Sequence, residues 1–188
     1  MATAKKTASG DCHVALLRGV NVGGKHRLPM KDLAAMFEAA GCRDVRTYIQ
    51  SGNVVFRAGA PLARKVPAVI AGTISRKFGF DAPVILRSTK EMLAITRGNP
   101  FLKPGVDITR LHVLFLADAP AKAAIGSLDP DRSPPDRFTV KGSEIFLHLP
   151  NGAGRSKLTN QYFDTKLETI SSARNWNTVT TLLELMQG

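Results

Sequence analysis

Apolar residues recur along the first half of the chain with spacings that predict alternating strands and helices. A short apolar run, followed by a glycine-rich stretch, is typical of a buried strand and the loop that leaves it. Pro29 suits a first helical turn, and Gly41 supplies a stop for the helix between them. We therefore expect strands at residues 13–18, 45–48, 53–56 and 83–87, and helices at residues 30–40, 65–78 and 88–98.

The same order of elements recurs after a stretch rich in proline and glycine, residues 98–109. We expect strands at residues 111–116, 138–140, 144–149 and 169–171, and helices at residues 120–125, 162–167 and 179–186. Two successive β-α-β-β-α-β patterns predict an α+β protein with two ferredoxin-like halves that contain antiparallel sheets. A single mixed sheet remains an alternative.

This organisation predicts four segments. Residues 1–10 are small and polar and are expected to form a flexible tail. The first ferredoxin-like half is expected at residues 11–97, a linker at 98–109 and the second half at 110–188.

Charge is distributed unevenly between the halves of this 188-residue chain, whose formal net charge is +11. Residues 1–100 hold 16 lysines and arginines against 6 acidic residues, whereas residues 101–188 hold 10 against 9. A cationic first half could recruit nucleic acid or a phosphorylated small molecule, because clustered cations concentrate anions. A solvated basic surface with no partner is the alternative.

Several classes of protein are disfavoured. No apolar run reaches the roughly 18 residues of a membrane span, and the first residues lack the apolar stretch of a secretory signal. We expect a cytoplasmic protein with no membrane partner. The two cysteines and four histidines show no metal-ligand spacing and no catalytic-triad motif, so we expect no metal site. No cofactor is indicated.

Four runs carry a family resemblance: ALLRGVNVGG at residues 15–24, TYIQSGNVVF at 47–56, KLTN at 157–160 and ARNWNTV at 173–179. In these runs the chain resembles the domain-of-unknown-function 1697 family, whose members are uncharacterised and mostly bacterial. The resemblance implies a fold of two ferredoxin-like halves. It implies no reaction.

Two candidate ligand sites lie in the first half. Glycine-rich loops can turn backbone N–H groups toward an anion, and flanking cations add charge. The loop candidates are Arg18, Asn21, Gly23, Gly24 and Lys25. The turn between two strands contributes Gln50, Ser51 and Asn53, more polar side chains than a tight turn needs. Structural turns are the alternative for both segments.

Two further candidates lie in the second half. Arg155 and Lys157 follow Gly152 and Gly154 in a stretch that leads into a helix capped by Thr159 or Asn160, a place where phosphate can bind. Arg174 and Trp176 could contact an aromatic or nucleobase ligand through cation–π interaction and stacking. Trp176 as a core anchor is the favoured alternative.

Together these features favour binding of a phosphorylated or nucleotide-type anionic ligand. A nucleic-acid-binding module without sequence specificity, or a structural or interaction protein without catalysis, are the alternatives. Whether a reaction follows binding stays open. Because the first and third strands of a β-α-β-β-α-β unit are neighbours, Arg18 and Asn53 should lie at one edge of a sheet, and Arg18, Lys25, Gln50 and Asn53 should converge on one pocket there.

Overall fold

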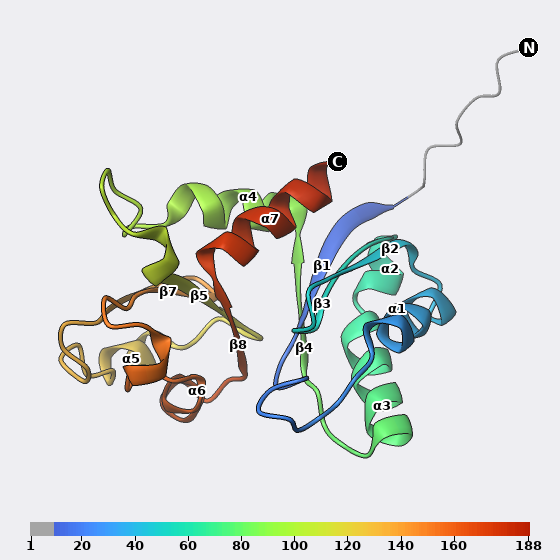
Figure 1. Cartoon of the computed structure of the whole chain (residues 1–188), viewed down its shortest axis with the longest axis horizontal. Helices are drawn as coiled ribbons and strands as arrows, with labels where there is room; N and C mark the ends of the chain where they lie inside the picture. Colours follow the sequence, from blue (N-terminus) through green and yellow to red (C-terminus); the bar gives the residue numbers. More distant parts are fainter. Residues whose placement is uncertain (1–9) are drawn as a thin grey trace, which may run out of the picture. The chain divides into compact units, whose positions relative to one another are not determined.

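The structure, a computed structural model, describes residues 10–188 and divides the chain into two compact units, Met1–Thr89 and Lys90–Gly188 (Figure 1). The linker expected at residues 98–109 falls within the second unit. The tail expected at residues 1–10 lies, apart from Gly10, outside the described residues.

The first unit contains one four-stranded antiparallel sheet with the strand order β2-β3-β1-β4. Its helices pack on one face of that sheet (Figure 1). The elements are β1 (Asp11–Leu17), α1 (Met30–Ala39), β2 (Arg43–Tyr48), β3 (Asn53–Ala58), α2 (Ala60–Ala63), α3 (Val66–Phe78) and β4 (Val84–Ser88).

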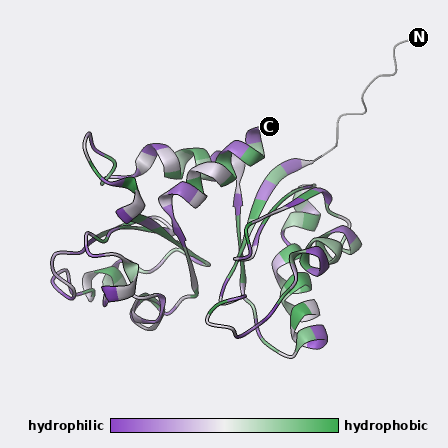
Figure 2. Cartoon of the chain, viewed as in Figure 1, coloured by the Kyte–Doolittle hydropathy of each residue, from purple (hydrophilic) through white to green (hydrophobic). Residues whose placement is uncertain are grey.

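Local sequence explains both long helices of this unit. Helix α1 begins directly after Pro29, and its buried residues include Leu33 and Phe37, four positions apart on one face. Helix α3 carries proline in its first turn and ends at Gly79, whose φ of +74° is the left-handed conformation that glycine adopts without strain. Hydrophilic and hydrophobic residues intermix along both helices (Figure 2), as expected of amphipathic helices on a sheet.

The second unit repeats this plan with the strand order β6-β7-β5-β8, again antiparallel throughout. Its strands are β5 (Leu111–Leu116), β6 (Arg137–Lys141), β7 (Glu144–His148) and β8 (Ser171–Asn175). Its helices are α4 (Thr89–Gly98, from the unit boundary), η1 (Ile108–Arg110), α5 (Lys122–Gly126), η2 (Ala153–Arg155), α6 (Asn160–Leu167) and α7 (Trp176–Gln187). The predicted α+β class with two antiparallel sheets is confirmed, and the alternative of one mixed sheet is excluded.

The last strand differs from the prediction. A strand at residues 169–171 was expected, but β8 spans Ser171–Asn175 and pairs with β5 from Leu116↔Ser171 to His112↔Asn175. Serine, alanine and asparagine have little intrinsic preference for strands, so pairing with the apolar β5 places this strand. Asn175 then caps α7, because its side chain accepts a hydrogen bond from the backbone N–H of Thr178 at 2.8 Å.

The two sheets place a buried arginine at equivalent register positions. Arg87 of β4 lies opposite Val14 of β1, and Arg174 of β8 lies opposite Val113 of β5. The two arginines are 6% and 8% exposed. This correspondence extends the repeat from element order to the positions of single residues.

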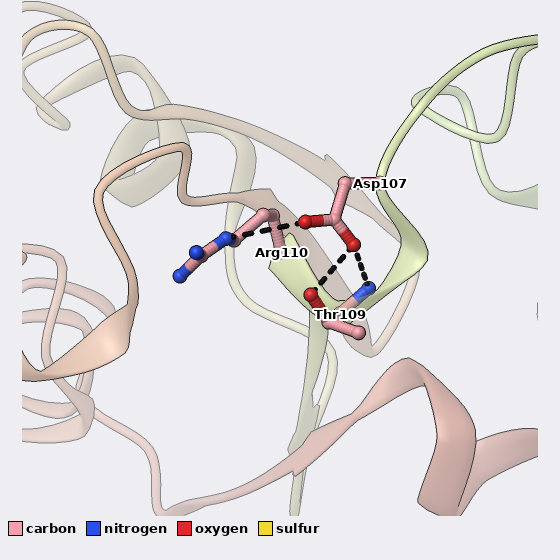
Figure 3. Close-up of polar contacts among 3 residues, drawn as sticks. All are labelled: Asp107, Thr109 and Arg110. Atoms are coloured by element: carbon pink, nitrogen blue, oxygen red, sulfur yellow. Dashed lines mark hydrogen bonds and ion pairs between the residues drawn. The ribbon is translucent and has the colours of Figure 1, made fainter.

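A capped turn leads into β5. One carboxylate oxygen of Asp107 accepts hydrogen bonds from the Thr109 hydroxyl at 2.6 Å and the Thr109 backbone N–H at 2.9 Å (Figure 3). The other lies 3.4 Å from Nε of Arg110. The hydroxyl and amide bonds from Thr109 lower the pKa of Asp107, so its carboxylate is ionised at neutral pH and can accept both bonds.

No helix within residues 10–188 is long and apolar enough to cross a membrane.

Burial of His112 on β5 makes stability depend on pH. Burial lowers the pKa of His112 from its ordinary 6.5, the main cause being loss of hydration. The unfolded chain therefore binds a proton at His112 more readily than the folded chain does. The free energy of unfolding that this residue contributes decreases as pH falls below about 6.5. We expect His112→Asn to reduce the slope of unfolding free energy against pH between pH 7 and pH 5, measured by urea denaturation. An unchanged slope would contradict this account.

Candidate functional site

The end of β1 and the start of β3 meet at one edge of the first sheet. Leu16 pairs with Asn53, and the backbone N–H of Leu17 donates to the carbonyl of Gly52 at 2.8 Å. Arg18 follows β1 directly, so Arg18 and Asn53 lie at the same edge.

Gly52 is the tightest point of this edge. A Cβ at residue 52 would lie 2.5 Å from Cγ2 of Val20 and 2.8 Å from Cβ of Leu17. Its φ of +70° is also left-handed. The hairpin between β2 and β3 can therefore pack against the end of β1 only if residue 52 has no side chain.

Asn21 joins the glycine-rich loop to that hairpin. Its Nδ2 donates to the carbonyl of Gln50 at 2.8 Å and to the carbonyl of Leu28 at 2.9 Å, while its Oδ1 accepts from the backbone N–H of Leu28 at 2.8 Å. These three bonds use both donors and one lone pair of the amide. Asn21 thus holds the two loops together in the free protein.

Gly23 and Gly24 form the two central residues of a tight turn. Their φ angles are +58° and +75°, and the backbone N–H of Lys25 donates to the carbonyl of Val22 at 3.0 Å. Two consecutive positive φ angles characterise a type I′ turn, which favours glycine at both positions. The Lys25 side chain is exposed at the end of this turn.

The polar residues of the hairpin hydrogen-bond to one another and to the glycine-rich loop. Asn53 is fully buried, and its Nδ2 donates to Oγ of Ser51 at 2.9 Å and to the carbonyl of Tyr48 at 3.2 Å. Gln50 is exposed, and its backbone carbonyl accepts the hydrogen bond from Nδ2 of Asn21. The structure therefore joins the glycine-rich loop to the hairpin through Asn21, and the side-chain amides of Asn21 and Asn53 have partners within these segments.

A separate pocket of about 300 Å³ lies beside helix α6 in the second unit. We call it the α6 pocket, and it is lined by Arg132, Thr159, Gln161, Tyr162, Thr165 and Lys166. Thr159 caps the helix, as predicted, by accepting a hydrogen bond from the backbone N–H of Tyr162 at 3.2 Å.

Arg132 is held in place at the pocket by two contacts. Its guanidinium carbon lies 4.2 Å from the centre of the Tyr162 ring, and its Nε donates to the carbonyl of Lys157 at 3.3 Å. Tyr162 is itself fixed, because its hydroxyl accepts a hydrogen bond from the backbone N–H of Asp129 at 2.9 Å. These contacts place the guanidinium of the exposed Arg132 over the Tyr162 ring at the pocket.

The remaining polar groups of the pocket lack partners. Within residues 10–188, the two terminal nitrogens of Arg132, the ammonium of Lys166 and the hydroxyl of Thr165 make no hydrogen bond or ion pair. Two cations and a hydroxyl at one small pocket form a set of donors that suits an oxyanion.

The stretch containing Arg155 and Lys157 connects to this pocket. The backbone N–H of Lys157 donates to Oγ of Ser133 at 3.1 Å, and its carbonyl holds Arg132. Arg155 is exposed at the end of η2. Sequence reasoning missed Arg132 and Lys166. An arginine inside the proline-rich loop at residues 129–136 was the one available signal for Arg132.

The remaining candidates, Arg174 and Trp176, are both buried. Nη1 of Arg174 donates to Oγ of Ser172 at 2.9 Å and to the carbonyl of Ala173 at 2.7 Å. Burial lowers the pKa of Arg174 to about 10, which leaves it charged at neutral pH. Trp176 is 3% exposed in the first turn of α7, a position that suits a core anchor.

Comparison with known proteins identifies the family. The family described as protein of unknown function (DUF1697) matches residues 11–146, which is most of the chain. The chain belongs to the DUF1697 family. The family resemblance is thereby confirmed, with the runs at residues 15–24 and 47–56 inside the match and those at 157–160 and 173–179 beyond it, and membership assigns no activity.

Among solved structures, this DUF1697 protein is similar to the conserved bacterial protein SP0830 from Streptococcus pneumoniae. The two are 20% identical, with a TM-score of 0.72 over 94% of this chain and 98% of the other. That likeness shows the fold alone. No curated protein matches the chain.

Gly52 and Gly24 provide a matched test of the edge geometry. Both have left-handed φ angles, +70° and +75°, but a Cβ at Gly24 would meet nothing within 4 Å. We expect Gly24→Ala to cost about 1 kcal/mol through backbone strain alone. Gly52→Ala adds a clash with Val20 and Leu17 and should cost on the order of 2–4 kcal/mol in urea denaturation. Equal losses for the two variants would contradict the proposed close packing.

Proposed function

We propose that this DUF1697 protein binds a small phosphorylated ligand in the α6 pocket. The observation that carries the proposal is Arg132, a cation fixed by Tyr162 and Lys157 whose two terminal nitrogens have no partner within residues 10–188. A guanidinium held in this way can bind two phosphate oxygens without first losing side-chain freedom.

The other pocket residues complement that contact. Lys166 supplies a second positive charge, and Thr165 supplies a hydroxyl donor. A volume of about 300 Å³ lies at the lower end of ligand-binding cavities, which favours a phosphate with a small organic body over a dinucleotide. Lys157, exposed two residues before Thr159, could add charge at the rim.

The glycine-rich loop supports anion binding less well than the α6 pocket does. Its glycines form a hairpin turn, and the side-chain amide of Asn21 is already hydrogen-bonded to the backbone of Leu28 and Gln50. Lys25 remains an exposed cation without a fixed position.

We also infer that each unit is ferredoxin-like, because its element order β-α-β-β-α-β and its strand order are those of that plan. Ferredoxin-like folds serve many functions, so the proposal rests on the pocket and not on the fold. We propose that the protein binds this ligand, and we propose no reaction.

Substitution of Arg132 tests the proposal. We expect Arg132→Gln to weaken the binding of inorganic phosphate at least tenfold, since a charge-assisted hydrogen bond contributes about 1.5–3 kcal/mol. Phosphate is titrated at low ionic strength, and backbone amide shifts of residues 159–166 report binding by NMR.

Lys103→Gln is the matched control, because Lys103 is an exposed lysine of the same unit that does not line the pocket. It should leave phosphate affinity unchanged. Equal weakening by both variants would indicate a general charge effect, and the absence of amide shifts at residues 159–166 would exclude the α6 pocket.

A second candidate function is non-specific binding of nucleic acid by the first unit. The excess of cations in residues 1–100 favours it, and Arg43, Arg46, Lys65 and Lys77 are among the exposed cations there. Affinity for a fluorescent single-stranded oligonucleotide should fall steeply as salt rises from 50 to 200 mM, because binding releases counterions. Absence of binding at low salt would eliminate this function.

A further inference from the structure

Ile49 occupies an unfavourable position in two respects. Its φ is +48°, a left-handed conformation that strains a β-branched residue, and its side chain is 51% exposed to water. Glycine or asparagine would adopt this backbone more easily. The free protein therefore gains little from isoleucine here, which points to a contact outside the chain.

Val22 shows a similar exposure on the neighbouring loop. It is 64% exposed at the tight turn that Gly23 and Gly24 form. The bond from Asn21 to the carbonyl of Gln50 joins the two loops, and Val22 and Ile49 are the sequence neighbours of these bonded residues. Two exposed aliphatic side chains are thus presented on connected, hydrogen-bonded loops.

The surroundings of these two side chains are cationic. Lys25 and Arg27 are exposed on the loop of Val22, and Arg46 is exposed on the strand that leads to Ile49. Residues 12–31 and 45–80 contain no aspartate or glutamate. Asp32 and Asp44 directly adjoin these ranges, and Asp81 follows Phe80, whose ring stacks on His26 of the loop with centroids 4.6 Å apart.

We propose that Val22 and Ile49, with the cations around them, dock an acidic segment of a partner protein that carries aliphatic side chains. Preformed loops reduce the entropy lost on binding, and the charge complementarity would steer an acidic segment to them. The site lies on the first unit and is independent of the α6 pocket.

Other occupants fit less well. Single-stranded nucleic acid stacks on exposed aromatic rings, which Val22 and Ile49 do not provide. Two aliphatic side chains bury far less apolar surface than a myristoyl chain, which by itself binds membranes only marginally. A second copy of this chain would bring another +11 net charge to a surface that is already cationic.

The test is selection of a random dodecapeptide display library against the full chain. We expect enrichment of peptides that combine aspartate or glutamate with leucine, isoleucine or valine. A synthetic copy of the most enriched peptide is then titrated by calorimetry. Ile49→Gly and Val22→Ser should each weaken its binding at least tenfold.

Val69→Ala is the matched control, because Val69 is an exposed aliphatic residue (43%) on α3 of the same unit. Peptide affinity should not change in this variant. Ile49→Gly relieves the left-handed strain, so its melting temperature should be at least that of the natural chain, and its loss of binding cannot then be ascribed to unfolding.

Three results would overturn the proposal. The first is a library that shows no enrichment above background. The second is a selected peptide that binds the Ile49→Gly variant as tightly as the natural chain. The third is binding to vesicles containing phosphatidylserine that depends on Ile49, with no binding of peptide. The last would assign the same side chains to a membrane surface.

Discussion

The central strand of each sheet is the element on which the rest of its unit depends. Strand β1 pairs with β3 on one side and β4 on the other, and β5 pairs in the same way with β7 and β8. In β1 the four residues from Val14 to Leu17 are at most 1% exposed. Because side chains alternate between the two faces of a strand, this run is apolar on both faces, and its register fixes the register of both neighbours.

Antiparallel pairing around β1 also brings two loops to one edge of the sheet, where three constraints operate together. Gly52 permits close contact with Leu17 and Val20, Asn21 bonds across to Gln50, and Gly23 with Gly24 closes the turn. These residues belong to the runs that carry the family resemblance, and each of them helps to hold the two loops together. Ile49 is the exception, because neither its backbone angle nor its exposure benefits the fold.

Sequence patterns predicted the elements with strong periodicity and missed those that depend on tertiary pairing. The strand at residues 111–116 was predicted with the bounds that the structure shows, because LHVLFL is apolar apart from His112 and has turn residues on both sides. Strand β8 was misplaced since Ser171–Asn175 has no strand-like pattern of its own. The short helix α2 was not predicted, because four residues hold too little periodicity.

The candidate sites show the same limit. Asn21, Gly52 and Asn53 could be identified as unusual from sequence, but only the folded chain shows which partners their side chains and backbone contact. Arg132 escaped prediction as a pocket residue because Arg132 and Tyr162 lie thirty residues apart and meet only in the folded chain. No spacing rule links a loop arginine to a helix tyrosine at that distance.

The central claim is that the anion site lies in the α6 pocket of the second unit and not at the glycine-rich loop of the first. A crystal structure of the protein in the presence of phosphate tests this most directly. The account predicts a phosphate within hydrogen-bond distance of the terminal nitrogens of Arg132 and the ammonium of Lys166. A phosphate bound to the backbone N–H groups of residues 23–25, with the α6 pocket holding none, would contradict it.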